Sequence, residues 1–195
     1  MKAIILAGGE NRRIGLNKAF IRLSPRGRTI IENQIKILKE VFEEVLIITN
    51  SPPAYKHLGV KLIPDIIPHQ GPLGGIYTGL SSSESFHNFF LACDMPFPNI
   101  NLIAYMKDLV TDYDVVVPRT ESGYQAVFAF YSKNCLLSLK RQMDSGNLKI
   151  VDFFSQAKVR TIGPEELTQF DPEEISFFNI NTQEDLAKAR DIALP

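Results

Sequence analysis

The sequence predicts a single-domain α/β protein, a Rossmann-like three-layer sandwich with a mainly parallel sheet, spanning residues 1–195. Three observations support this fold class. Short apolar runs rich in β-branched residues recur along the chain, and each is closed by Gly, Pro or polar residues, as buried parallel strands are. Segments with apolar residues at helical spacing separate these runs. No repeat, low-complexity tract or clear linker divides the chain.

The first half of the chain alternates most regularly. Strands are expected at Ala3–Ala7, Val45–Thr49, Val60–Ile63 and Asn88–Cys93. A helix is expected at Thr29–Phe42, where Ile and Leu follow helical spacing and Thr29 can cap the first turn. The segment Ile67–Gly75 is rich in Pro and Gly, so we expect a loop that leads into a helix near Ile76–Ser82.

The second half continues the pattern with shorter signals. Strands are expected at Asp114–Val117, Ala126–Tyr131 and Ser176–Ile180. Helices are expected at Asn101–Leu109, Lys133–Met143, Lys149–Phe154 and Thr182–Ile192. Because parallel strands are joined by right-handed crossovers, these helices should cover both faces of the sheet and give the three layers.

Composition excludes several classes of protein. The chain is 45% hydrophobic and 22% charged, which suits a globular core and not a disordered segment. Its 21 Lys and Arg against 22 Asp and Glu leave no basic surface for nucleic acid. The apolar runs are far shorter than the roughly 20 residues that span a bilayer, and two cysteines do not make a disulfide scaffold. We therefore expect a cytoplasmic protein with no nucleic-acid or membrane partner.

The loop after the first strand carries the features of a phosphate site. It reads Leu6-Ala7-Gly8-Gly9, continues through Arg13 and reaches Lys18. Glycines let backbone N–H groups approach a phosphate closely, and the two basic side chains can supply charge to the β- and γ-phosphates. The loop is neither Gly-x-Gly-x-x-Gly nor a Walker A sequence, which argues against a dinucleotide oxidoreductase and a P-loop NTPase. A solvated glycine turn is the alternative.

A second chemical signal is Asp94, which directly follows the strand expected at Asn88–Cys93. A carboxylate at this position is a hard oxygen ligand suited to Mg²⁺, with substrate phosphates completing the shell. The alternative is an N-cap for the following segment. Ligands of such sheets bind at the carboxyl ends of the strands, so we expect the loops there to form one cleft. These loops contain Gly8–Lys18, Asn50, Asp65, Asp94 and Asn179–Asn181.

Four segments, in order along the chain, together resemble the molybdenum cofactor guanylyltransferases, which are nucleotidyltransferases of the GT-A-like type. They are the Leu6–Lys18 loop, Gly71-Pro72-Leu73-Gly74-Gly75-Ile76, Cys93-Asp94-Met95-Pro96-Phe97, and Phe178-Asn179-Ile180-Asn181-Thr182-Gln183-Glu184-Asp185-Leu186. The chain departs from the family pattern at Ile14 for Met, at Gly74 for Ala, and at Gln125-Ala126, where many members carry His-Pro.

The resemblance implies transfer of GMP from GTP to the phosphate of molybdenum-molybdopterin, a phosphorylated pterin that carries molybdenum. The products would be the guanine dinucleotide form of the cofactor and pyrophosphate, and Mg²⁺ would be the metal cofactor. A molybdoenzyme or its chaperone would be a further partner. By resemblance, the catalytic residues are Lys18, Arg13 and Asp94, with Asp94 as the metal ligand. The nucleotide would contact Leu6, Ala7, Gly8, Gly9, Lys18, Asn50, Asp65 and Asp94. The pterin side would comprise Asn179, Asn181 and Lys149.

Alternatives remain at two levels. Asn50 and Asp65 could instead form turns, Asn181 could cap the last helix, and Lys149 could be a solvated lysine. The function could be that of a cytidylyltransferase for the same pterin, a sugar-phosphate nucleotidyltransferase, or a non-catalytic nucleotide- or cofactor-binding module. By resemblance, cytidylyl members favour Leu-Ala-Ala-Gly in the first loop, so Gly8 favours guanine.

Overall fold

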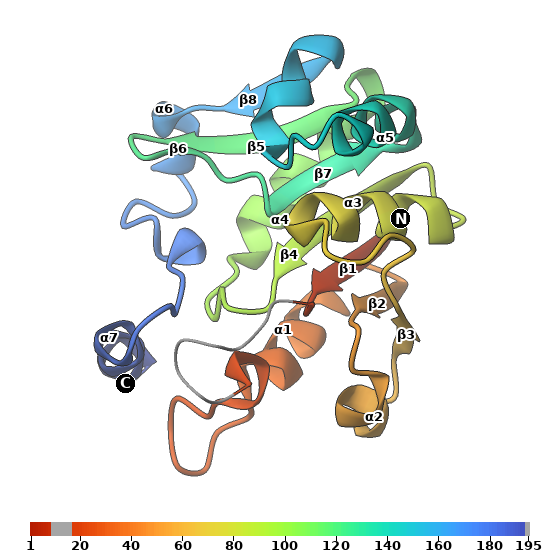
Figure 1. Ribbon diagram of the computed structural model, residues 1–195. Coiled ribbons are helices and arrows are strands. Elements are labelled where there is room, and N and C mark those ends of the chain that lie inside the picture. Colours follow the sequence, from red (N-terminus) through yellow and green to blue (C-terminus); the bar gives the residue numbers. More distant parts are fainter. Residues whose placement is uncertain (9–16, 194–195) are drawn as a thin grey trace.

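A computed structural model describes residues 1–8 and 17–193 of the chain and has one central sheet (Figure 1). The strand order is β3-β2-β1-β4-β7-β5-β6, and β8 pairs with β5. The first four strands run parallel to one another: β3 (Lys61–Ile63), β2 (Glu44–Ile48), β1 (Lys2–Leu6) and β4 (His87–Ala92). The carboxyl ends of these strands therefore meet at one edge of the sheet.

The other half of the sheet is mixed. β7 (Phe128–Ser132) runs antiparallel to β4 and to β5 (Val115–Thr120), and the short β6 (Gly123–Tyr124) pairs antiparallel with β5. β8 (Val159–Ile162) runs parallel to β5. The turn that leads from β5 through β6 to β7 consequently lies at the same edge as the carboxyl end of β4.

Helices cover both faces of the sheet, so the predicted three-layer sandwich is confirmed. On one face, α1 (Ile30–Leu38) and α4 (Ile100–Asp108) pack with Ala3 and Ile5 in one buried cluster. On the other face, α3 (Gly71–Ser82) and α5 (Leu136–Asp144) pack with Ile4 in a second cluster. The alternation of Ala3, Ile4 and Ile5 between the two clusters follows from the period of two along a strand.

Shorter helices complete the part of the chain that is described. The remaining α-helices are α2 (Pro52–Tyr55), α6 (Pro164–Leu167) and α7 (Gln183–Ala193). The 3-10 helices are η1 (Lys18–Phe20), η2 (Lys56–Leu58), η3 (Val110–Asp112), η4 (Lys133–Cys135), η5 (Ile150–Gln156) and η6 (Ile175–Phe177). Over residues 1–8 and 17–193, no helix is long and apolar enough to cross a membrane.

The predicted cap of the first helix is confirmed. Thr29 Oγ1 accepts a hydrogen bond from the Glu32 backbone N–H at 3.4 Å, and Glu32 Oε2 accepts one from the Thr29 backbone N–H at 2.8 Å. Each side chain satisfies an N–H that has no partner inside the helix. The helix ends at Leu38, earlier than the predicted Phe42.

The predicted loop at Ile67–Gly75 is wrong in its second part, because α3 begins at Gly71 and not near Ile76. Pro72 suits the first turn of a helix, where its missing N–H has no partner to lose. Leu73 is fully buried, and this burial outweighs the low helix propensity of the glycines. Gly79 is needed for contact with β4, since a Cβ there would lie 2.6 Å from Phe90 Cε1.

The strand predicted at Ser176–Ile180 is also wrong. The chain forms η6 there, because the carboxylate of buried Asp171 accepts hydrogen bonds from the backbone N–H groups of Ile175 (3.1 Å) and Ser176 (2.8 Å). A carboxylate that satisfies two successive N–H groups holds a tight turn and not an extended strand. The helix predicted at Lys149–Phe154 is the 3-10 helix η5.

Candidate active site

The carboxyl edge of the sheet gathers the predicted loops around β1 and β4. Backbone pairing continues just past the strands, with the Ala7 N–H donating to Ile48 O at 2.9 Å and the Cys93 N–H to Leu6 O at 3.1 Å. Gly8 and Asp94 therefore leave the sheet from neighbouring strands. This places Gly8 and the aspartate turn beside each other, as the parallel arrangement predicts.

Lys18, Asp94 and Asn181 come together at this edge from three distant parts of the sequence. Lys18 Nζ lies 3.6 Å from Asp94 Oδ2 and donates a hydrogen bond to Asn181 Oδ1 at 2.9 Å. The Ile180 N–H donates to the Asp94 carbonyl at 3.0 Å, which fixes the Asn179–Asn181 segment over the aspartate turn. The side chains of Lys18 and Asp94 are 16% and 25% exposed, so the cluster is partly shielded and still reachable.

Lys18 is held in place by its own short helix. Asn17 caps η1, since its side-chain oxygen accepts from the Ala19 N–H at 3.2 Å, and its amide donates to the Tyr55 hydroxyl at 3.0 Å. The lysine therefore projects from a capped turn that is anchored to α2. The anchored turn therefore keeps the Lys18 ammonium group at one position.

Asp94 is a largely buried carboxylate whose described charged neighbour is Lys18. Burial raises the pKa of Asp94, and the nearby Lys18 ammonium lowers that pKa only in part. Among residues 1–8 and 17–193, no three His, Cys, Asp or Glu side chains gather at a possible metal site. One carboxylate is nevertheless enough for Mg²⁺ when substrate phosphates supply further oxygens, so the donor set fits a magnesium ion that arrives with a nucleotide.

Gln34, which the sequence analysis did not select, supports the Asp94 turn from beneath. This fully buried residue of α1 donates from Nε2 to Ala92 O at 2.9 Å and to Met95 O at 2.7 Å. The two carbonyls lie on either side of Asp94 in the chain. Gln34 Oε1 is buried and has no hydrogen-bond partner among the described residues. In the sequence, the signal that could have identified Gln34 was the presence of a polar residue on the apolar face of α1.

Asn50 and Asp65 form a pair beside Gly8. Asn50 Nδ2 donates to Asp65 Oδ2 at 2.8 Å, and the Asp65 N–H donates to Asn50 Oδ1 at 3.0 Å. A Cβ at Gly8 would lie 3.4 Å from Asp65 Oδ2. Asp65 Oδ1 is buried without a partner in the part of the chain that the structure describes, and burial raises the pKa of Asp65 although Asn50 lowers it in part. The pair therefore offers a carboxylate acceptor to a ligand that brings N–H donors.

The structure brings together some of the predicted site residues and separates others. Leu6 and Ala7 lie at the end of β1 with Gly8, whereas Gly9 and Arg13 lie outside the described residues. Asn179 turns back on its own segment, with Nδ2 donating to Phe177 O at 2.8 Å. Lys149 is 72% exposed and its Nζ lies 3.3 Å from Asp152 Oδ1.

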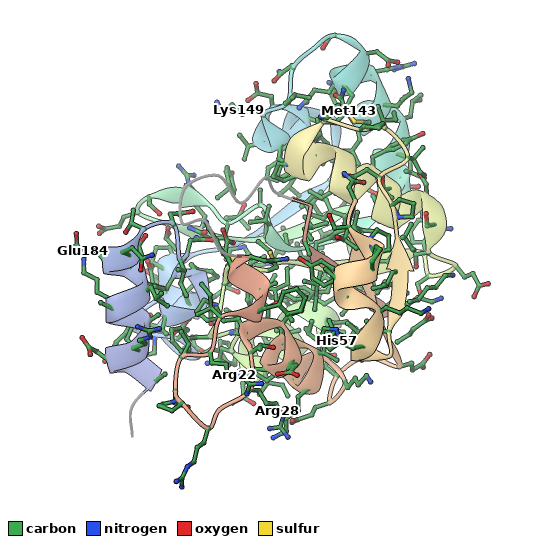
Figure 2. The ribbon with its side chains drawn as sticks, turned by 60° about the horizontal axis from the view of Figure 1, so that its bottom comes forward. Arg22, Arg28, His57, Met143, Lys149 and Glu184 are labelled. Atoms are coloured by element: carbon green, nitrogen blue, oxygen red, sulfur yellow. The ribbon has the colours of Figure 1, made fainter. Side chains whose placement is uncertain are left out.

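Lys149 lies away from the labelled residue of α7, Glu184. Figure 2 shows Lys149 well separated from Glu184, which follows Asn181 by three residues. The Lys149 side chain pairs with Asp152 of η5, the Lys149 carbonyl accepts from Gln142 Nε2 of α5 at 2.8 Å, and the pterin role of Lys149 stays a prediction.

Two capping alternatives are decided by the hydrogen bonds. Asn181 does not cap α7 with its side chain, because the Thr182 hydroxyl accepts from the Asp185 N–H at 3.1 Å and Asp185 accepts from the backbone of Asn181 and Thr182. Asp94 does not cap the helix after it, because the Asn99 side chain accepts from the first N–H groups of α4. Both side chains are therefore free of a capping role and face the Lys18 cluster.

Comparisons with known proteins agree with the fold and with the motifs. The family model described as a MobA-like NTP transferase domain matches residues 3–159. A probable molybdenum cofactor guanylyltransferase from Natranaerobius thermophilus is 38% identical over 97% of this chain and 95% of its own. A molybdenum cofactor guanylyltransferase from Desulfosudis oleivorans is 39% identical over 95% of this chain and 92% of its own.

A solved structure extends the likeness to three dimensions. The crystal structure of molybdopterin-guanine dinucleotide biosynthesis protein A from Archaeoglobus fulgidus superposes with a TM-score of 0.84 at 27% identity. The match covers 99% of this chain and 98% of that one. The sheet and its helices therefore follow that protein over nearly the whole length.

Proposed function

The chain belongs to the molybdenum cofactor guanylyltransferases of the MobA-like NTP transferase family and is a nucleotidyltransferase, and on that premise we propose that it transfers GMP from GTP to the terminal phosphate of molybdopterin. In this reaction the acceptor phosphate oxygen forms a bond to the α-phosphorus of GTP, the bond to the β-phosphate oxygen breaks, and pyrophosphate leaves. The meeting of Lys18, Asp94 and Asn181 at the carboxyl edge of the sheet is the observation that carries the proposal.

A displacement of this kind needs positioning and charge more than a protein nucleophile. Lys18 would stabilise the negative charge that grows on the departing pyrophosphate. Asp94 would hold Mg²⁺ together with the phosphates of GTP, and the bound ion would neutralise phosphate charge. Asn181 holds the Lys18 ammonium through its side-chain oxygen and so keeps it directed at the cluster.

The choice of guanine would rest on Asp65 and Asn50. The Watson–Crick edge of guanine carries two adjacent N–H donors, the ring N1–H and the 2-amino group, and one carboxylate can accept from both. Asp65 Oδ1 is the buried acceptor left without a partner among the residues described. Cytosine presents one amino donor beside a ring acceptor, so the same carboxylate would pair with it less well. Gly8 leaves room at this point for a base to approach.

A comparison of the four nucleoside triphosphates tests the proposal. A ligand stabilises the folded protein by mass action, by about 2.7 kcal/mol at 100 times its Kd, so GTP with Mg²⁺ should raise Tm most at equal concentration. Adding molybdopterin should then release pyrophosphate with GTP faster than with CTP, ATP or UTP. Preference for CTP or UTP would overturn the guanine assignment, and absence of pyrophosphate release with all four would overturn the reaction.

A variant pair sharpens the test of guanine choice. Asp65→Asn keeps the shape of the side chain but replaces one acceptor by a donor, so the preference for GTP over CTP should fall by at least tenfold. Asp144→Asn changes an exposed carboxylate on α5 and should leave the preference unchanged. If Asp65→Asn weakens the binding of GTP and of CTP equally, Asp65 shapes the turn and does not select the base.

A further inference from the structure

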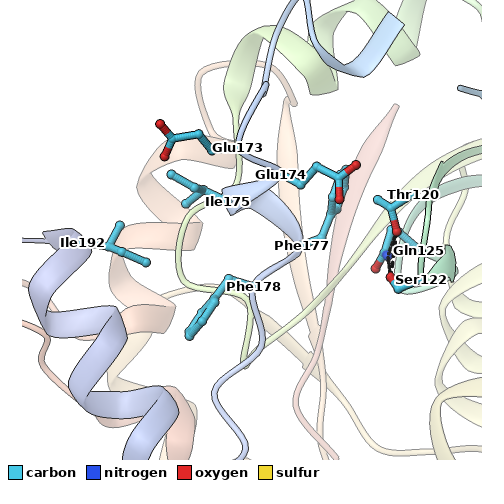
Figure 3. A pocket seen from close by; sticks show the side chains of 9 residues that line it. All are labelled: Thr120, Ser122, Gln125, Glu173, Glu174, Ile175, Phe177, Phe178 and Ile192. Carbon is cyan, nitrogen blue, oxygen red and sulfur yellow. Dashed lines mark hydrogen bonds between the residues drawn. The ribbon is translucent and has the colours of Figure 1, made fainter. Parts of the chain in front are cut away.

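A cavity of about 450 Å³ is lined by the turn between β5 and β7, by the segment that precedes Asn179, and by Ile192 of α7 (Figure 3). Thr120, Ser122 and Gln125 line it from the turn that joins β5, β6 and β7. Glu174 and Phe178 line it from the segment that leads to Asn179. The volume is in the range of pockets that hold small organic ligands.

Two of the segments that line the cavity continue to backbone hydrogen bonds at the Asp94 turn. On one side, the Ala92 N–H donates to Val127 O at 3.0 Å, two residues beyond Gln125. On the other side, the Ile180 N–H donates to Asp94 O at 3.0 Å, two residues beyond Phe178. Each of these lining segments is therefore two residues from a hydrogen bond with the turn that carries Asp94.

The sheet sets the order of the sites along its carboxyl edge. Asn50 and Asp65 follow β2 and β3 on one side, Asp94 follows β4 in the middle, and the cavity lies beyond β7 and β5 on the other side. The Asn50–Asp65 pair is assigned to the base of GTP, so a cavity on the other side of Asp94 leaves separate room for the acceptor.

Glu174 is held in the cavity wall by its backbone. The carboxylate of Asp171 fixes the next two backbone N–H groups, and Glu174 itself has a φ of 53°, which a residue with a Cβ seldom adopts. Its carboxylate has no hydrogen bond or ion pair to any residue that the structure describes. Figure 3 shows this carboxylate directed toward Thr120 and Gln125, whereas the side chain of Glu173 points away from them.

We propose that this cavity binds the ring of the acceptor pterin, with the Glu174 carboxylate accepting hydrogen bonds from its 2-amino group and the adjacent ring N–H. Gln125 Nε2 donates to Thr120 Oγ1 at 3.1 Å and makes a longer contact to Ser122 Oγ at 3.5 Å, and the 4-oxo group of the ligand would replace the longer contact as acceptor. Phe178 offers an aromatic surface to the flat ring. This assignment rests on the proposed function, which supplies the pterin as acceptor. It gives Glu174 on the acceptor side the same chemical task that Asp65 has on the nucleotide side.

Guanine and pterin share the 2-amino-4-oxo-pyrimidine edge that a carboxylate recognises, so the test must distinguish the two ligands. The probes are GTP with Mg²⁺ and a phosphorylated 6-alkylpterin. Pterin emission can be followed directly because the chain has no Trp, and GTP binding is followed by thermal shift. The variants are Glu174→Gln, Glu165→Gln as the matched control at an exposed glutamate outside the cavity lining, and Gln125→Ala as a second change in the opposite wall.

Glu174→Gln should raise the Kd for the pterin at least tenfold and leave the Kd for GTP unchanged, since a hydrogen bond to a charged group is worth about 1.5–3 kcal/mol. Gln125→Ala should also weaken pterin binding, and Glu165→Gln should change the Kd of neither ligand. Gln125→Ala decides the case if Glu174→Gln lowers Tm so far that its binding is not measurable. Equal pterin binding by Glu174→Gln and the parent would overturn the proposal, as would no pterin binding by the parent.

Loss of GTP binding in Glu174→Gln would also overturn the proposal, because the cavity would then hold guanine. The measurements of pterin and GTP binding do not depend on catalysis. If pterin binding depends on Glu174 but no pyrophosphate is released, the proposed function fails and the cavity assignment stands. If GMP transfer proceeds normally in Glu174→Gln, the cavity assignment fails and the proposed function stands.

Discussion

Gln34→Leu should loosen the turn that carries Asp94 while leaving the fold in place. The leucine side chain is similar in volume and suits the apolar face of α1, on which Ile31, Ile35 and Leu38 are buried. The change removes both hydrogen bonds from Gln34 Nε2 to the aspartate turn. It also removes the buried Oε1 that has no partner among the described residues.

The cost in the free energy of unfolding can be worked out from these contacts. Ala92 O keeps a hydrogen bond from the Met95 N–H at 3.3 Å, so Met95 O is the carbonyl that loses its partner. A lost hydrogen bond costs about 1 kcal/mol, and a buried acceptor left unpaired costs about 1–3 kcal/mol. Removing the unpaired Oε1 of Gln34 offsets part of this cost. We expect a net loss of about 2 kcal/mol, or roughly 4–8 °C in Tm for a chain of this size.

The decisive assay is the Mg²⁺ dependence of GMP transfer, because a loosened Asp94 should bind the ion less well. The Mg²⁺ concentration for half-maximal rate should rise several-fold in Gln34→Leu, and saturating Mg²⁺ should restore most of the rate. Asn88→Leu is the matched control, since fully buried Asn88 accepts from Ser83 Oγ at 2.6 Å near the opposite end of β4. If both variants shift the Mg²⁺ requirement equally, Gln34 stabilises the core and does not position Asp94.

Three further outcomes are expected. Lys18→Met should lower kcat by about 10²–10³ and change GTP affinity much less; kinetics that show a raised KM with kcat retained would make Lys18 a binding group only. Gly79→Ala should lower the urea midpoint of unfolding, because the new Cβ would lie 2.6 Å from Phe90 Cε1. Overpacking of this kind costs about 1–3 kcal/mol, whereas alanine gains about 1 kcal/mol in helix propensity. An unchanged midpoint would contradict this prediction. Burial alone would raise the pKa of Asp114, but hydrogen bonds from one backbone amide and two side chains hold this pKa below its usual value. The stabilisation that Asp114 provides is therefore present above its unfolded-state pKa and is lost as pH falls through its folded-state pKa. Asp114→Asn should flatten the pH dependence of the free energy of unfolding between about pH 5 and pH 2. An unchanged slope would argue against this role of Asp114.

Sequence patterns predicted the elements whose signals are local. β1, β2 and β4 are short β-branched or aromatic runs with clear stops, and Thr29 caps α1 as its spacing to Glu32 indicates. They also predicted that loops after the parallel strands converge, and Lys18 and Asp94 do lie together. The roles of these residues in catalysis stay predictions.

The features that sequence patterns missed depend on tertiary contacts. The residue types around Glu174 do not indicate that the Asp171 carboxylate holds this segment in a turn, where a strand was expected. The early start of α3 depends on the burial of Leu73 in the first turn of the helix. Gln34 was detectable only as a polar residue on an apolar helix face, and its partners became identifiable once α1 was placed beneath β4.

The fate of the GTP phosphates tests the central claim most directly. With GTP labelled at the α-phosphate, Mg²⁺ and molybdopterin, the label should appear in a pterin–guanine dinucleotide, and label at the γ-phosphate should appear in pyrophosphate. Both products should form in equal amounts and only when the pterin is present, and Asp94→Asn should abolish them without unfolding the protein. Release of the α-label as free GMP at a rate independent of the pterin would contradict the account.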